Sequence, residues 1–85
     1  MTNSLGNNDI RTFKYHISFI DEKNITVYYI SIEDFDERTA YIRACERFAA
    51  SEGVKPERTE IDYEHWKIRF PYETFNVVII PDKIA

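Results

Sequence analysis

The sequence predicts an α+β domain in which an antiparallel sheet of roughly four strands, in the order β-β-α-β-β, packs a single helix on one face. Two observations predict this class: segments with a two-residue alternation of apolar and polar side chains flank one segment with a helical period. The 85 residues are enough for one domain, and 44% hydrophobic and 15% aromatic residues are enough to form its core. We expect residues 1–9 to be a flexible tail and residues 10–85 to form a single α+β domain.

The first two strands are predicted to form a hairpin. Phe13, Tyr15, Ile17 and Phe19 alternate with polar residues, which is typical of a half-buried strand. A second strand is expected at residues 25–32, where β-branched and aromatic residues are dense. The polar residues 21–24 between them have the length of a hairpin loop.

A helix is predicted from Asp34 or Phe35 to Glu52. Asp34 is a suitable N-cap, and Glu37 follows it at the spacing of a capping box. Gly53 suits the position after the helix end, where a positive φ is common. The expected core stripe recurs at intervals of three and four residues: Tyr41, Ala44, Cys45 and Phe48.

Extended structure is expected again after residue 59. Ile61 and Tyr63 occupy odd positions, whereas Trp66, Ile68 and Phe70 occupy even ones. This change of phase predicts a bulge or bend near residues 64–65. Residues 71–74 form a turn signal, and residues 75–80 complete the sheet. The sequence leaves the order of the strands open.

Both faces of the predicted sheet are apolar, although one helix can cover only one of them. The odd positions of the second strand continue the alternation of the first, so we expect Ile25, Val27 and Tyr29 to face the helix. The opposite face is then either covered by the tail, the turn at residues 71–74 or strong coiling of the sheet, or it is an interface with a protein partner or a second copy of the chain, which is the prediction we follow. Its residues are Tyr28, Ile30, Ile32, Val78 and Ile80.

No catalytic, cofactor or metal site is predicted. His16 and His65 lack partners at metal-ligand spacing, and two glycines cannot build a glycine-rich phosphate loop. Cys45 lies within the apolar stripe and is expected to be a core residue. No signal peptide or membrane segment is recognised, and one cysteine excludes an internal disulfide, so we expect a cytoplasmic protein that does not bind membranes.

The acidic side chains form two groups in the sequence, residues 33–37 and residues 57–64. Two interpretations are open: the carboxylates belong to solvated faces with weak ion pairs, or they form a surface that imitates nucleic acid, as small acidic phage inhibitors do. The net charge of −4 disfavours nucleic-acid binding. The predicted function is therefore a non-catalytic interaction or inhibitor protein, and a single-stranded nucleic-acid-binding module using Tyr28, His16 and Trp66 is the alternative. The acidic residues are Glu33, Asp34, Asp36, Glu37, Glu57, Glu60, Asp62 and Glu64.

Overall fold

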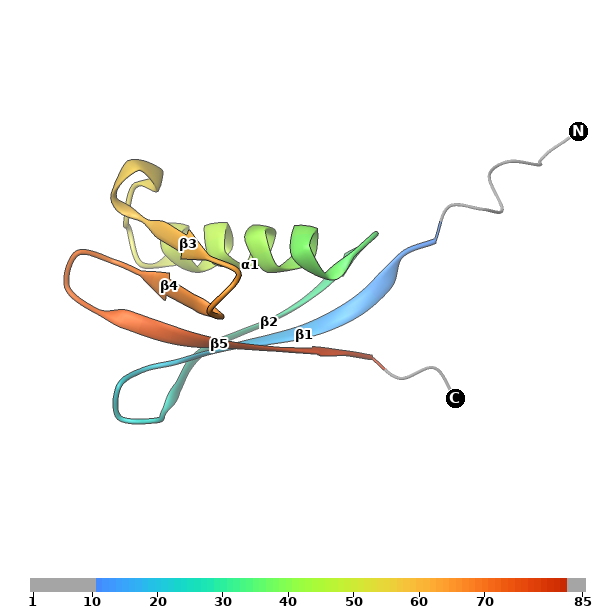
Figure 1. Cartoon of the computed structure of the whole chain (residues 1–85), viewed down its shortest axis with the longest axis horizontal. Helices are drawn as coiled ribbons and strands as arrows, with labels where there is room; N and C mark the ends of the chain where they lie inside the picture. The colour runs from blue at the N-terminus through green and yellow to red at the C-terminus, as the bar shows by residue number, and fades with distance from the viewer. Residues whose placement is uncertain (1–10, 83–85) are drawn as a thin grey trace, which may run out of the picture.

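A computed structural model describes residues 11–82, which form one antiparallel sheet with an α-helix along one side (Figure 1). The predicted α+β class is confirmed, but the sheet has five strands, in the order β2-β1-β5-β4-β3. The expected tail, residues 1–9, lies outside the described residues. The elements are β1 (Phe13–Ile20), β2 (Thr26–Asp34), α1 (Glu37–Ser51), the 3₁₀ turn η2 (Pro56–Arg58), β3 (Glu60–Asp62), β4 (Lys67–Arg69) and β5 (Thr74–Pro81).

The predicted first hairpin is confirmed. The Asp21 side chain accepts hydrogen bonds from the backbone N–H groups of Lys23 and Ile25, both at 2.9 Å, and so closes the loop between β1 and β2. Asn24 takes a positive φ of 67°, which asparagine tolerates better than most residues. The loop is therefore stabilised by its own polar side chains.

A bulge at the start of β2 reverses the faces that we expected for this strand. Ile20 pairs with Thr26, but the next pair along the ladder joins Phe19 to Tyr28, so β2 carries one extra residue there. From that point the odd residues of β1 face the even residues of β2. Our assignment of Tyr29 to the helix side was wrong, because the extra residue moves every later side chain to the opposite face. Ile25 and Val27 lie before and at the bulge, and their side chains, 55% and 44% exposed, are not buried under the helix as we expected.

The N-terminus of α1 also differs from the prediction. Asp36, not Asp34, is the N-cap, and its carboxylate accepts the N–H of Thr39 at 2.7 Å. Asp34 instead ends β2, where its buried carboxylate receives Arg43 Nη1 at 2.7 Å. Two carboxylates two residues apart thus have different roles: one caps the helix, and the other links β2 to it.

The C-terminus of α1 is as predicted. Gly53 has φ of 72°, and its N–H bonds to the carbonyl of Ala50. The N–H of Val54 bonds to the carbonyl of Ala49, which completes a Schellman motif. Val54 then packs against the core, so the chain leaves the helix toward η2 and β3.

The expected bend near residues 64–65 is a complete turn, and this is why the sheet has five strands. Tyr63–Trp66 reverses the chain between β3 and β4, with the Trp66 N–H bonded to the Tyr63 carbonyl. Trp66 itself has φ of 58°, an uncommon conformation for a residue with a side chain. The Trp66 carbonyl accepts the N–H of Val77, which ties the turn to β5.

Phe48 of α1 lies at the centre of the core between helix and sheet. Its ring is 1% exposed and packs against Phe19, Tyr28, Phe70 and Phe75, with centroid separations of 4.5–5.2 Å. Such tilted and edge-on contacts between rings add to the free energy gained by burying them. The core therefore depends on one helical side chain that contacts β1, β2, β5 and the β4–β5 turn.

No helix formed by residues 11–82 has the length and apolar character needed to cross a membrane.

Replacing Phe48 with alanine removes this contact and leaves a cavity. We expect Phe48→Ala to lower the free energy of unfolding by about 3–5 kcal/mol, measured by chemical denaturation. Arg47→Ala, at an exposed position of the same helix, is the control and is expected to change it by less than about 0.5 kcal/mol. An unchanged denaturation midpoint for Phe48→Ala would contradict its central place in the core.

Candidate functional site

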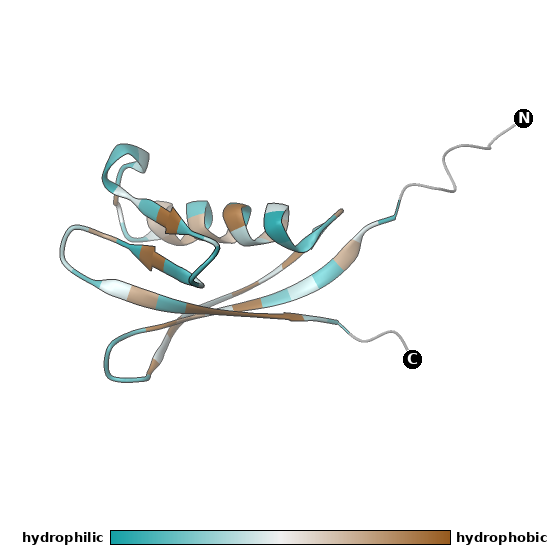
Figure 2. Ribbon diagram, in the orientation of Figure 1, coloured by the Kyte–Doolittle hydropathy of each residue, from teal (hydrophilic) through white to brown (hydrophobic). Residues whose placement is uncertain are grey.

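The sheet face opposite α1, here called the outer face, carries exposed apolar side chains. Figure 1 shows α1 along one side of the sheet only, and Figure 2 shows that much of β5 is coloured as hydrophobic. Tyr29 is 55% exposed, Val78 41% and Ile80 57%. We call these three residues the outer patch. Tyr29 comes from β2, and Val78 and Ile80 come from β5, with β1 between the two strands.

Polar side chains on β1 separate the two halves of the outer patch. Ser18 lies between Tyr29 and Val78 in the sheet register, and His16 lies between Ser31 and Ile80. The rings of His16 and Tyr29 are stacked, with planes 10° apart. The patch is therefore apolar at both sides and polar in the middle.

His16 lies at the centre of a hydrogen-bonded group, here called the His16 cluster. The hydroxyls of Tyr29 and Ser31 lie 2.5 and 3.0 Å from its Nδ1 and 2.8 Å from each other. Its Nε2 lies 3.3 Å from a carboxylate oxygen of Asp82. Nothing in the sequence pattern indicated this cluster, because it depends on the register that joins β2, β1 and the end of β5.

The cluster contains the residue types of a catalytic triad, but Asp82 lies at Nε2 and Ser31 at Nδ1 of His16, the reverse of the triad's arrangement. The Tyr29 hydroxyl also shares Nδ1 with Ser31, and Ser31 is exposed on an open sheet face. Nucleophilic catalysis also needs oxyanion donors and a site that excludes water. What the arrangement offers most directly is a set of hydrogen-bonding groups inside an apolar surface.

The residues that we expected at the interface divide between the two faces. Val78 and Ile80 lie on the outer face, but Tyr28, Ile30 and Ile32 lie on the helix side, where they pack with the core and Ile32 is 5% exposed. The physical reason is the bulge in β2, which exchanges the faces of its odd and even residues. The outer face thus gains Tyr29 in their place.

The aromatic platform expected for nucleic-acid binding does not form. Tyr28 packs against Phe48 on the helix side, whereas His16 lies on the outer face. Trp66 packs against Tyr41 and Tyr63 at the β3–β4 turn. Three rings from three regions cannot stack successive bases as one surface.

The first acidic group, residues 33–37, points in several directions. Asp34 is buried and bound to Arg43, whose guanidinium holds the pKa of that carboxyl below its usual value, with help from the Phe35 N–H. Glu37 accepts a hydrogen bond from the Tyr63 hydroxyl at 2.7 Å, and Asp36 caps the helix. Structural contacts therefore account for three of these carboxylates.

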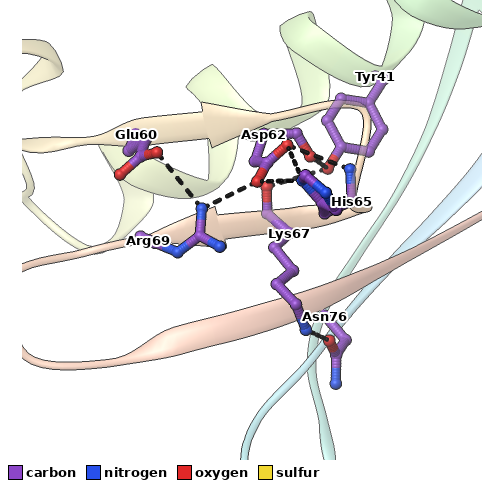
Figure 3. A network of polar contacts seen from close by, with 7 residues as sticks. All are labelled: Tyr41, Glu60, Asp62, His65, Lys67, Arg69 and Asn76. Atoms are coloured by element: carbon purple, nitrogen blue, oxygen red, sulfur yellow. Dashed lines mark hydrogen bonds and ion pairs between the residues drawn. The ribbon is translucent and has the colours of Figure 1, made fainter.

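The second acidic group includes a polar network on the β3–β4 hairpin (Figure 3). Asp62 accepts hydrogen bonds from Arg69 Nη1 at 3.0 Å and from the His65 N–H at 3.1 Å, and the arginine lowers its pKa. The buried Tyr41 hydroxyl donates to the Asp62 and Lys67 carbonyls, both at 3.0 Å, so it holds the two strands together from the helix. The network is a structural connection between α1 and the hairpin.

Glu60, Asp62 and Glu64 do share an open depression of about 690 Å³ between α1 and the hairpin. Arg38 and His65 line the same depression, so positive and polar groups alternate with the carboxylates there. Glu57 is exposed on η2 and lies outside it. The eight acidic residues therefore do not form one continuous negative surface.

Cys45 is a core residue, as the helical stripe predicts. Its side chain is 0% exposed, and burial raises the pKa of the thiol to about 12. The thiolate, which is the nucleophilic form, is scarce at neutral pH under these conditions. Among residues 11–82, no group of three or more His, Cys, Asp or Glu side chains is placed to hold a metal ion.

Comparison with known proteins adds no relative: no family model, curated protein or solved structure matches the chain.

The Asp34–Arg43 pair predicts a specific response to acid. A carboxyl with a lowered folded-state pKa stabilises the fold above its unfolded pKa, about 3.9, and this contribution is lost as the pH falls through the folded value. We expect Asp34→Asn to unfold at lower denaturant concentration at pH 7, and its difference from the wild type to shrink below about pH 4.

Asp36→Asn is the matched control, because asparagine caps a helix about as well as aspartate. It is expected to stay close to the wild type across the same pH range. A difference between Asp34→Asn and the wild type that stayed constant down to low pH would show that the charge of Asp34 contributes nothing.

Proposed function

We propose that the protein is a small non-catalytic interaction protein that binds another protein through the outer face of its sheet. One observation carries this proposal: the outer patch leaves Tyr29, Val78 and Ile80 between 41% and 57% exposed on a face that α1 does not cover. Exposed apolar side chains gathered on one face are typical of a protein-binding surface.

The composition of the outer patch suits recognition as well as affinity. Burying apolar surface contributes about 25 cal/mol per Å², part of which offsets the entropy lost on association. Tyrosine is frequent among the residues that dominate binding energy, and Tyr29 has neighbours on both sides that hold its ring and hydroxyl in place. The His16 cluster supplies donors and acceptors that a partner must match, because burying them unmatched is costly.

An inhibitor that occupies the apolar surface of its target is the class of interaction protein that this face suits best. The small size of the chain and its net charge of −4 fit a soluble binding partner acting in the cytoplasm, where its one free thiol stays reduced. The alternative, single-stranded nucleic-acid binding, now lacks its aromatic platform, since Tyr28, His16 and Trp66 lie apart. Retention on a polyanion column that weakens with salt would support that alternative.

A photoreactive side chain placed on the outer face tests the proposal. We expect p-benzoylphenylalanine at position 78 to crosslink a specific protein in extracts of the source cells, and the same group at position 47 of α1 not to do so. The crosslinked protein is then purified and its affinity measured directly. Ile80→Asp should weaken binding by at least about tenfold, since the new carboxylate would be desolvated without a partner.

Thr39→Asp is the matched control, because it adds the same charge at an exposed site in the first turn of α1, where a carboxylate is well tolerated. It should bind like the wild type, and both variants should unfold at the wild-type denaturant concentration. Equal crosslinking from positions 78 and 47, no crosslinking from either, or unchanged affinity of Ile80→Asp would contradict the proposal.

A further inference from the structure

Strand β2 lies at one edge of the sheet. It has nine residues, Thr26–Asp34, and among the described residues it pairs only with β1. The opposite edge strand, β3, has three residues. A long edge strand presents a row of unpaired backbone N–H and carbonyl groups, which is a template for pairing with another chain.

The direction of these backbone groups follows from the hydrogen bonds of β1. The Lys14 carbonyl accepts the Asp82 N–H, so the even residues of β1 point toward β5 and its odd residues point toward β2. Tyr15, Ile17 and Phe19 pair with Ile32, Ile30 and Tyr28. The N–H and carbonyl groups of Tyr29, Ser31 and Glu33 therefore point outward from the sheet edge.

Contacts at the two ends of β2 agree with this geometry and leave its middle open. At the C-terminal end, Arg43 Nη1 lies 3.3 Å from the outward carbonyl of Glu33. At the N-terminal end, the bulge near Thr26 interrupts the regular ladder. Between them, Tyr28–Ile32 contains no proline, lysine or other charged residue of the kind that usually blocks edge pairing.

We propose that β2 pairs with β2 of a second copy in antiparallel orientation, joining the two sheets into one continuous sheet. The charges of the strand favour the antiparallel direction. Glu33 and Asp34 both lie at the C-terminal end, so antiparallel pairing places the acids of the two copies at opposite ends of the interface. Parallel pairing would place them side by side, where like charges repel.

The backbone pattern is also self-complementary. A two-fold axis at Tyr29, Ile30 or Ser31 sets outward-pointing residues of one copy against outward-pointing residues of the other, as an antiparallel ladder requires. In this dimer the Tyr29 side chains of both copies lie on the same side of the joined sheet. The inference concerns the strand edge and goes beyond the proposed function, which concerns the outer face.

Proline at position 31 tests the edge directly. The Ser31 N–H points outward and has no backbone partner among residues 11–82, so proline is compatible with this edge position and still removes a donor that pairing needs. We expect sedimentation equilibrium to show dimers for the wild type and for Ser31→Ala, and at least about tenfold weaker association for Ser31→Pro. Ser31→Ala removes the same hydroxyl from the His16 cluster, so it isolates the effect of the backbone N–H.

Amide hydrogen exchange of the wild type keeps the inference falsifiable if Ser31→Pro fails to fold. The N–H groups of Tyr29 and Ser31 should become protected as the protein concentration rises, whereas those of Tyr28 and Ile30, bonded within the sheet, should be protected at every concentration. A wild type that stays monomeric at about 1 mM with freely exchanging Tyr29 and Ser31 amides would overturn the inference.

Two further outcomes separate this inference from the proposed function. Dimers that form without protection of the Tyr29 and Ser31 amides would associate through another surface, which overturns edge pairing and leaves binding through the outer face untouched. Conversely, loss of dimers in Ser31→Pro, together with unchanged partner binding by Ile80→Asp, would support edge pairing and contradict the proposed function.

Discussion

The structure depends on a single constraint: one helix of fifteen residues must bury one face of a five-stranded sheet. Phe48 meets this constraint at the centre, where its ring contacts rings from β1, β2, β5 and the β4–β5 turn. Tyr41 extends the coverage by bonding to backbone carbonyls at the β3–β4 hairpin. Because α1 packs on the inner face of the sheet, no element among residues 11–82 covers the outer face, and the apolar side chains there are exposed to water.

Much of this arrangement could be predicted from local patterns. Alternation identified β1, Gly53 identified the helix end, and the apolar stripe identified Phe48 and Cys45 as core residues. These features depend on neighbours close in sequence, where propensity and periodicity are informative. Asp34 and Asp36 were harder to separate, since both suit an N-cap, and only the burial of Asp34 beside Arg43 distinguishes their roles.

The outer face and its side chains were less predictable from the sequence. One extra residue in β2 determines whether Tyr28 or Tyr29 faces the helix, and no glycine or proline marks that bulge. The His16 cluster joins residues from positions 16, 29, 31 and 82, so it appears only when the register of three strands is known. The turn between β3 and β4 had a signal in the change of apolar phase, but Trp66 takes a positive φ there without being glycine.

The exposure of the outer face can be measured directly in solution. A soluble paramagnetic gadolinium chelate relaxes the methyl protons that it can approach, and dilute protein excludes contacts between copies of the chain. Methyl groups of Val78 and Ile80 should be relaxed strongly, whereas those of Ile17 and Ile68, both 0% exposed beneath α1, should be shielded. Equal shielding of all four residues would show that the chain covers its own outer face and would contradict the account.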